Sequence, residues 1–496
     1  MKGRIVALFL SCSWALTAAV GLAADPSDDA SPLPIPHVAD AITHHHAHIG
    51  GRDIAYTATA GTILLRDDKD APTASVFYVA FVAEGLGPSS RRPITFAYNG
   101  GPGASSALID IGALGPRMVV TTNGAATGPP PYKMVDNPDS LLDVTDLVFI
   151  DAVGTGLSRI VGKATAKNFY GVAPDGKAFE QFIRSYLTRN NRWNSPKYLA
   201  GESYGTTRSA VLGKLLQDDG ISVTGIILIS SILNFEGTDD HWFWTYLPSE
   251  AAIAAYHHKL PTQPSNLSEF LRSARAFASG PYLQALAKGA ALAPSERDAI
   301  AQQLHAYTGL PLDYIVRSRL RIPPERFEKE LLGSEDKTVG RYDGRFSAFN
   351  LDPIASDAQT DPSGDAIFGA FTATFNQYLR QDLAYTSDAH YLFLAFPVNK
   401  AWDWKTGEDS DPSGVNVLPD LLNAMTRNPY LRVFSANGLY DLATPFFATE
   451  YDLSHLGGDP SLQSRISFGY YPGGHMMYLN PEAHAALKRD LAAFYR

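Results

Sequence analysis

Hydrophobic positions along the chain come mainly as short runs with the character of buried strands. A strongly β-prone run covers residues 74–83, and residues 94–98, 147–150, 198–200 and 226–229 are apolar runs of the kind buried in a parallel sheet. Residues 205–217 have the apolar spacing of a helix. Strand patterns return at residues 431–435 and 465–470, and a last helix begins at Asn480-Pro481. This alternation predicts an α/β fold with a central, mostly parallel sheet and antiparallel N-terminal strands.

A long block without strand signals divides this pattern. Residues from about 239 to 332 have the pattern of successive helices separated by prolines. We therefore predict a helical cap over residues 239–350, inserted between a first core part at residues 41–238 and a second at residues 351–496. With 496 residues, of which 45% are hydrophobic and 19% charged, the chain is long enough for this arrangement and is not mainly disordered.

The N-terminus has the pattern of a secretory leader. Residues 1–24 begin with Lys2 and Arg4, continue as a mostly apolar stretch and end in small residues, which predicts a signal peptide cleaved near Ala24 and a tether over residues 25–40. Polar residues interrupt the stretch, which is shorter than the about 20 apolar residues of a membrane span, and no later segment approaches that length. Cys12, the only cysteine, lies in this leader, and lipid attachment there is the alternative. A secreted protein without disulfides suits a bacterial envelope, so we predict a periplasmic or secreted protein of bacterial type.

Charge and histidine content narrow the range of partners. The net charge is −10, from 41 Lys and Arg against 51 Asp and Glu, and no basic run offers a surface for phosphates, so nucleic acid is not an expected partner. His44, His46 and His48 would share one face of a strand. A metal site is one interpretation of these histidines. An exposed edge strand is the favoured one, because no acidic partner is near in sequence.

Residues 198–205 have the pattern of a serine nucleophile. A strand leads into G-E-S-Y-G at residues 201–205, and a helix follows. The two glycines allow a turn sharp enough to raise the Ser203 hydroxyl above the sheet edge, where the helix amides also point. The serine needs a base and an orienting acid. Asp441 and His475 fit these roles, because each lies in a loop after a predicted strand. The alternatives are an incidental serine in a glycine-rich turn, a helix N-cap for Asp441 and a structural loop residue for His475.

A second glycine-rich loop, N-G-G-P-G-A-S-S at residues 99–106, directly follows the strand at residues 94–98. Residues without side chains let a backbone approach a substrate closely, so this loop is a candidate source of amides for an oxyanion. A phosphate-binding loop is excluded, because no Lys-Ser/Thr follows at the required spacing and G-x-G-x-x-G is absent.

Four motifs together resemble those of the serine carboxypeptidase family, within the α/β-hydrolase fold. They are N-G-G-P-G-x-S-S at residues 99–106, a near match to D-x-P-V-G-T-G-x-S at residues 151–158, G-E-S-Y-[AG] at residues 201–205 and G-H-M at residues 474–476. The similarity runs from about residue 94 to the C-terminus, with the helical block in the place of the family's cap insertion.

The resemblance implies a role for each matched residue. The implied catalytic triad is Ser203, Asp441 and His475, the implied oxyanion hole is made by the amides of Gly101 and Tyr204, and the implied carboxylate-binding residues are Asn99, Gly100 and Glu202. The implied activity is that of a serine-type carboxypeptidase, which works through an acyl-enzyme on peptides with a free C-terminus and needs neither metal nor cofactor. An esterase or acyltransferase with the same triad is the alternative. A non-catalytic binding protein is disfavoured, because no triad residue is missing.

One departure from the family bears on substrate recognition. Glu202 must carry a proton to bind a carboxylate, so acid pH should favour peptide binding; a purely structural buried acid is the alternative role. The family often places a second acid where this chain has Ala113, and Asp110 could substitute only if its stretch is helical. Arg208, on the helix after Ser203, is expected to pair with an acid rather than to touch substrate.

Overall fold

The structure is a computed structural model that describes residues 31–88, 90–236, 240–405 and 415–496. The predicted signal peptide, with its cleavage site near Ala24 and with Cys12, lies outside these residues, as does the first part of the predicted tether. In the described ranges, no helix is both long enough and apolar enough to cross a membrane.

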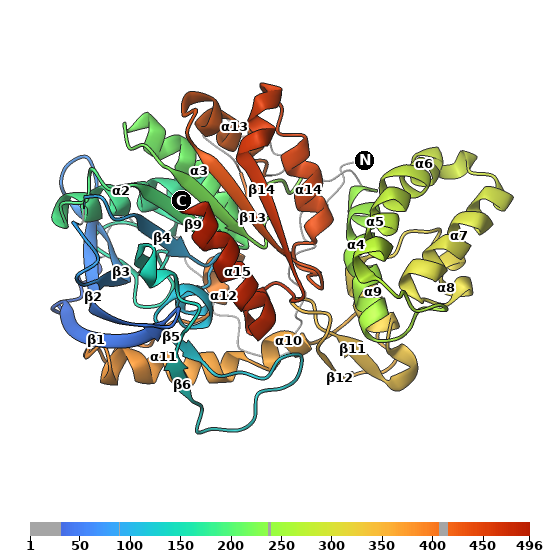
Figure 1. Cartoon of the computed structure of the whole chain (residues 1–496), viewed down its shortest axis with the longest axis horizontal. Coiled ribbons are helices and arrows are strands. Elements are labelled where there is room, and N and C mark those ends of the chain that lie inside the picture. The colour runs from blue at the N-terminus through green and yellow to red at the C-terminus, as the bar shows by residue number, and fades with distance from the viewer. Residues whose placement is uncertain (1–30, 89, 237–239, 406–414) are drawn as a thin grey trace.

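A ten-stranded mixed sheet forms the centre of the described chain (Figure 1). Nine strands lie in the order β1-β2-β3-β7-β4-β9-β10-β13-β14, and β8 pairs with β3. Pairing is antiparallel from β1 to β7 and parallel from β7 to β14. The predicted fold class is therefore confirmed. The strands are β1 (Ala41–Ile49), β2 (Arg52–Arg66), β3 (Pro72–Ala83), β4 (Ile94–Tyr98), β7 (Asp146–Ile150), β8 (Arg159–Ile160), β9 (Lys197–Glu202), β10 (Gly225–Ile229), β13 (Arg432–Gly438) and β14 (Ile466–Tyr471).

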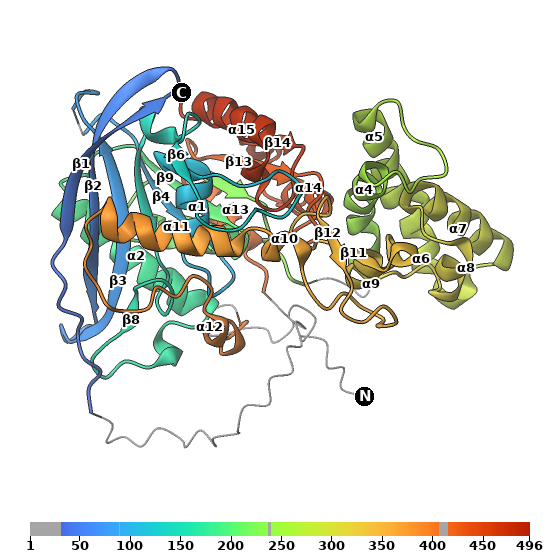
Figure 2. The same cartoon turned by 90° about the horizontal axis from the view of Figure 1, so that it is seen from below.

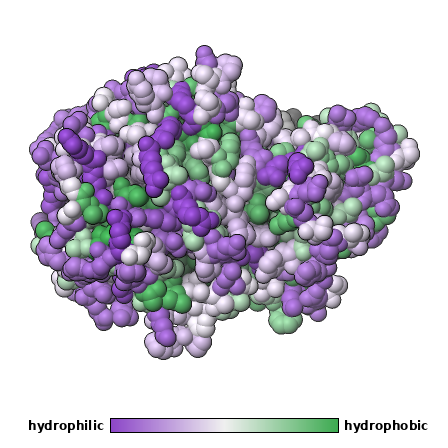
Figure 3. Space-filling view, in the orientation of Figure 1, coloured by the Kyte–Doolittle hydropathy of each residue, from purple (hydrophilic) through white to green (hydrophobic). Residues whose placement is uncertain are grey.

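Helices cover both faces of this sheet. Successive strand residues point to opposite sides, so an apolar strand contributes to a core on each face. In β10, Ile227 belongs to one core and Ile226 to the other. The first core includes residues of α1 (Ala107–Ile109), α11 (Phe368–Gln381) and α15 (Pro481–Phe494), and the second includes residues of α2 (Val172–Arg189), α3 (Tyr204–Asp218) and α13 (Leu418–Arg427). Short helices α10 (Pro362–Asp365), α12 (Phe396–Lys400) and α14 (Phe446–Ser454) and the strand pair β5 (Arg117–Val119) and β6 (Met134–Asp136) complete this part. The face drawn in Figure 3 is mainly polar, with apolar residues in small groups.

The block after residue 239 is helical, as its pattern predicts. It contains α4 (His241–Tyr256), α5 (Leu267–Phe277), α6 (Leu283–Lys288), α7 (Pro294–Thr308), α8 (Leu312–Arg317) and α9 (Pro324–Glu330). These helices lie together at one end of the molecule in both views (Figures 1 and 2). Their core includes Tyr440 and Leu442, the neighbours of Asp441, so the block packs directly on a loop of the sheet. An unexpected strand pair, β11 (Lys337–Val339) and β12 (Ser347–Phe349), follows. That residues 239–350 act as a cap stays a prediction.

The histidine-rich strand β1 lies at the edge of the sheet, as the favoured interpretation predicted. His44 Nδ1 lies 3.0 Å from Glu84 Oε1, and His46 Nδ1 lies 3.0 Å from Asp53 Oδ2. Acidic partners are thus present, from β2 and from the end of β3. In the part of the chain that the structure describes, no three His, Cys, Asp or Glu side chains are grouped so as to hold a metal ion.

Arg208 pairs with an acid, as expected from its position on α3. Its Nε and Nη2 donate to the Asp175 carboxylate at 2.7 and 3.2 Å, and its Nη1 donates to the Asn99 carbonyl at 2.8 Å. The guanidinium is 4.2 Å from the centroid of the Phe179 ring. Arg208 is 1% exposed, so it joins α3 to α2 and to the loop after β4 rather than facing a substrate.

Candidate active site

The turn between β9 and α3 carries Ser203. Its backbone has φ 60° and ψ −130°, a left-handed conformation that is strained for a residue with a side chain. The turn is held by the N–H of Ser203, which donates to the Ile229 carbonyl at 3.0 Å. A Cβ on Gly201 would lie 2.1 Å from the Gly205 carbonyl oxygen, so the first predicted glycine is required by close backbone approach. The predicted strand, sharp turn and helix are all present.

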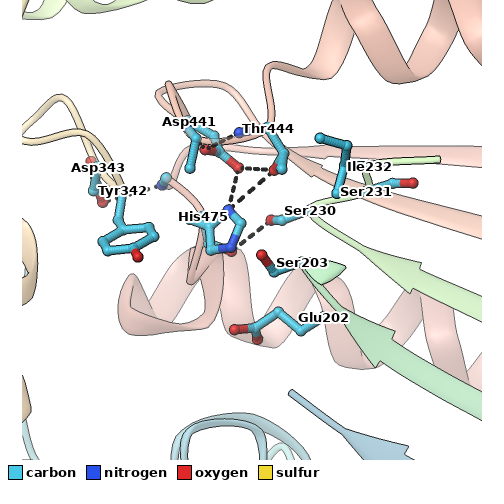
Figure 4. Close-up of polar contacts among 12 residues, drawn as sticks. Glu202, Ser203, Ser230, Ser231, Ile232, Tyr342, Asp343, Asp441, Thr444 and His475 are labelled. Carbon is cyan, nitrogen blue, oxygen red and sulfur yellow. Dashed lines mark hydrogen bonds and ion pairs between the residues drawn. The ribbon is translucent and has the colours of Figure 1, made fainter. Parts of the chain in front are cut away.

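The structure brings Asp441 and His475 together from the loops after β13 and β14. His475 Nδ1 lies 2.8 Å from Asp441 Oδ2 (Figure 4). Asp441 is fully buried, and its Oδ1 accepts the N–H groups of Ala443 and Thr444 at 2.7 and 2.9 Å. The Thr444 hydroxyl donates to Oδ2 at 2.7 Å. These bonds fix the carboxylate against the imidazole, and Thr444 is a residue that the sequence did not single out.

Ser203 lies on the other side of the imidazole. In Figure 4 its hydroxyl is drawn on the side of His475 away from Asp441. The structure records no hydrogen bond between the Ser203 hydroxyl and His475, and such bonds are often long until substrate binds. Burial alone would lower the pKa of His475, but the charge and hydrogen bond of Asp441, together with Glu202, outweigh it, and the pKa is raised above its ordinary value. An imidazolium formed at this position is therefore stabilised.

The segment after β11 supports the His475 loop. The N–H of His475 donates to the Tyr342 carbonyl at 2.5 Å, and the N–H of Gly474 donates to Asp343 Oδ2 at 3.1 Å. On its other side, the His475 carbonyl accepts the Ser230 hydroxyl at 2.6 Å. The loop is thus held from two directions, by groups that sequence reasoning missed. An Asp-Gly pair at residues 343–344 is a turn signal, but it does not reveal what the turn supports.

The predicted oxyanion donors lie next to the nucleophile turn. Tyr204 is the first residue of α3, so its N–H has no acceptor one turn earlier in the helix. Gly100 packs on that helix end: a Cβ placed there would lie 2.4 Å from the Tyr204 nitrogen and 2.8 Å from the Glu202 carbonyl oxygen. Gly101, with φ 101°, turns the chain immediately beyond this contact. The loop after β4 and the N-terminus of α3 can therefore direct their amides toward one point.

Glu202 is buried directly before the nucleophile. Asn99 Nδ2 donates to Glu202 Oε1 at 2.8 Å, and the Tyr478 hydroxyl donates to Oε2 at 2.8 Å. Burial raises the pKa of Glu202 to about 7, although His475 and the two hydrogen bonds favour the charged form. Asn99, Gly100 and Glu202 thus lie together, and Glu202 can hold a proton near neutral pH. Tyr478 is a further residue that the sequence analysis did not predict.

Asp110 does not take the place of the second acid, whose usual position is occupied here by Ala113. Its stretch is helical, as that substitution requires, in α1 and the π-helical turn η1 (Asp110–Leu114). However, both Asp110 carboxyl oxygens are buried without a hydrogen-bond partner in the described chain, so Asp110 does not reach Glu202. Burial, together with the nearby Asp151, raises the pKa of Asp110 well above its ordinary value. The Asp110 carboxyl instead lies against the backbone of Gly115, where a Cβ would be 2.3 Å from Asp110 Oδ1.

Comparison with known proteins finds sequence similarity over part of the chain. Residues 59–235 match the serine carboxypeptidase family model. This match contains Ser203 but ends before Asp441 and His475. A carboxypeptidase Y homolog of Arthroderma benhamiae is 33% identical over 135 residues, which cover 27% of this chain and only 24% of that protein.

The similarity of fold extends over most of the chain. The crystal structure of Kex1(delta)p, a prohormone-processing carboxypeptidase from Saccharomyces cerevisiae, aligns with a TM-score of 0.56 at 16% identity and covers 89% of this chain and 91% of that one. This likeness establishes the α/β-hydrolase fold. Both of these proteins are fungal, and the bacterial type expected from the leader stays a prediction.

Replacing Gly100 tests how closely the turn and the loop must approach. The Cβ of Gly100→Ala would meet backbone atoms of Glu202, Tyr204 and Gly205, which have little freedom to move. We expect hydrolysis of any substrate of the site to fall by about a hundredfold in kcat/KM, because misplacement by about 1 Å has this effect. Gly128→Ala is the matched control, since a Cβ there meets nothing within 4 Å. Equal activity in the two variants would contradict the close packing.

Proposed function

We propose that this protein is a serine-type carboxypeptidase that releases C-terminal amino acids from peptides. The observation that carries the proposal is the buried Glu202, which stands next to Ser203 and has a pKa of about 7. A hydrolase of simple esters has no need of a buried, proton-holding acid beside its nucleophile. A carboxypeptidase does, because a neutral carboxyl donates a hydrogen bond to the substrate carboxylate, whereas an ionised one repels it.

Ser203, His475 and Asp441 carry out the reaction in two halves. The Ser203 hydroxyl attacks the carbonyl carbon of the last peptide bond while His475 accepts its proton, and the amides of Gly101 and Tyr204 stabilise the oxyanion. His475 then protonates the departing amino acid as the peptide bond breaks, which leaves an acyl-enzyme. Water, deprotonated by His475, attacks this ester, and the proton returns to Ser203 as the shortened peptide leaves. Asp441 orients the imidazole throughout.

The carboxylate of the substrate selects the bond that is cleaved. Asn99, Gly100 and protonated Glu202 would hold the C-terminal carboxylate at the end of the site, which leaves the last peptide bond over Ser203. We also propose that the enzyme is periplasmic or secreted after loss of residues 1–24, and that residues 239–350 are its cap. The net charge of −10 and the absence of a basic run in the sequence agree with a peptide rather than a nucleic acid as partner.

The triad is tested by comparing single and double variants. Ser203→Ala should lower kcat by on the order of a millionfold, because the nucleophile is lost. His475→Ala should cost about as much, and the double variant should be hardly worse than either, because the residues act as a unit. Circular dichroism of each variant should match the wild type. Losses that add on a logarithmic scale would mean that His475 acts independently of Ser203.

The role of Glu202 is tested by the pH dependence of peptide binding. Hydrolysis of peptides with a free C-terminus should fall as pH rises through about 7, chiefly through a higher KM, because Glu202 then ionises. Glu202→Gln cannot ionise, so it should flatten this alkaline fall. The Gln side chain fits the same place, since the Tyr478 hydroxyl can accept a hydrogen bond as well as donate one.

C-terminal amides of the same peptides, and simple esters, are the control substrates. They lack the carboxylate, so their KM should not show the alkaline rise in either protein, and free peptides should be preferred over amides below pH 7. An alkaline fall that persists unchanged in Glu202→Gln would remove Glu202 from substrate recognition. Equal turnover of free peptides and amides at all pH values would favour an esterase or acyltransferase.

A further inference from the structure

The loop after β14 supplies two groups to the site rather than one. His475 lies at its centre, and Tyr478, three residues later, lies in the short helical turn η8 (Met477–Leu479). The Tyr478 side chain is 1% exposed, and its hydroxyl lies 2.8 Å from Glu202 Oε2. One short segment therefore positions both His475, the base beside Ser203, and the hydroxyl that makes one of the two hydrogen bonds to Glu202.

Of the two groups bonded to Glu202, only Tyr478 can change its role. Asn99 Oδ1 accepts the N–H of Ile109 at 2.9 Å, so the other end of the amide, Nδ2, faces Glu202 and can only donate. A tyrosine hydroxyl both donates and accepts. When Glu202 is ionised, Tyr478 donates to it. When Glu202 is protonated, Tyr478 is the bonded neighbour that can receive the Glu202 O–H.

The ring of Tyr478 packs against Gly112, a residue that has no side chain. A Cβ on Gly112 would lie 2.8 Å from Tyr478 Cε2 and 3.0 Å from the Phe371 ring, so the tyrosine packs directly on the backbone of η1. The next residue, Ala113, is fully buried, and its carbonyl lies 2.8 Å from His484 Nε2. Gly112 thus leaves the volume that the ring occupies, and this packing positions the hydroxyl at Glu202.

We propose that Tyr478 is the positioning residue that keeps the Glu202 proton available for the substrate carboxylate. In the free enzyme the O–H of neutral Glu202 donates a hydrogen bond to the Tyr478 oxygen. When a carboxylate binds, the Glu202 O–H turns to it, and the Tyr478 O–H turns to donate to the Glu202 oxygen. No bond to carbon changes, and each proton stays on its own oxygen. This inference rests on the proposed carboxypeptidase function.

The ionisable groups that face Glu202 and Tyr478 are mainly those of the candidate active site itself. Glu202 faces His475, which favours its ionised form, and Asp441, which disfavours it. Tyr478 faces Glu202, and its ring centroid lies 6.4 Å from that of His484. The hydrogen bond from Tyr478 lowers the pKa of Glu202, against the larger effect of burial. Removing only the Tyr478 hydroxyl should therefore raise the pKa of Glu202. It should also leave the Glu202 carboxyl less firmly oriented.

Tyr478→Phe tests this inference through a pH profile. The midpoint of the alkaline fall in kcat/KM for free peptides should move up by about one pH unit, because a hydrogen bond to a carboxylate is lost. KM below that midpoint should rise several-fold, since the carboxyl is less well oriented. Tyr471→Phe is the matched control: that buried hydroxyl also donates to an acid, Asp490 Oδ2 at 2.7 Å, in the same strand-and-loop region. It should leave the alkaline midpoint unchanged.

A second measurement needs no peptide turnover. The infrared band of the protonated Glu202 carboxyl, assigned by its loss in Glu202→Gln, should titrate at higher pH in Tyr478→Phe than in the wild type. An unchanged band and profile in Tyr478→Phe, or an equal shift in Tyr471→Phe, would overturn the inference. If the wild type hydrolyses no free peptide, the proposed function fails, while the infrared titration still decides whether Tyr478 controls the Glu202 proton.

Discussion

The strained backbone turn at Ser203 determines how every other part of the site is arranged. A left-handed conformation at a residue with a side chain costs about 1–3 kcal/mol, and here it is held between the Ile229 carbonyl and the glycines that pack around it. The turn raises Ser203 at the sheet edge, starts α3 at Tyr204 and leaves Glu202 buried at the end of β9. Nucleophile, amide donor and acid are therefore consecutive residues whose directions are set by one backbone conformation.

Two buried acids on either side of the nucleophile are placed for different tasks. Asp441 accepts hydrogen bonds from two amides and a hydroxyl as well as meeting His475, so its carboxylate has one orientation. Glu202 has two partners and a pKa of about 7, so it can exist in both protonation states near neutral pH. Asp441 is therefore suited to orient the His475 imidazole. Glu202 is suited to bind a carboxylate, because its protonated form can donate a hydrogen bond to that group. The segment between β11 and β12 contributes through Tyr342 and Asp343, whose hydrogen bonds hold the loop that carries His475.

Local patterns in the sequence were enough to predict the sheet and to select Ser203, Asp441 and His475. The apolar run at residues 94–98 coincides with β4, and loops that follow parallel strands meet at one sheet edge, so these candidates could be found without coordinates. Contacts between distant segments could not. The Gly474 amide meets Asp343, 131 residues earlier, and Tyr478 meets Glu202, 276 residues earlier. Asp110 illustrates the same limit, because the sequence could state the condition that its stretch be helical but not which groups its carboxyl contacts.

Covalent labelling of Ser203 is the measurement that tests the central claim most directly. A fluorophosphonate reacts with a serine hydroxyl that a neighbouring base activates, with loss of fluoride, and peptide mass spectrometry locates the adduct. The account predicts a single adduct on the peptide containing Ser203, formed by the wild type and not by His475→Ala, with the rate rising as pH passes through the pKa of His475. An adduct at another residue, or labelling of Ser203 that is equally fast without His475, would contradict it.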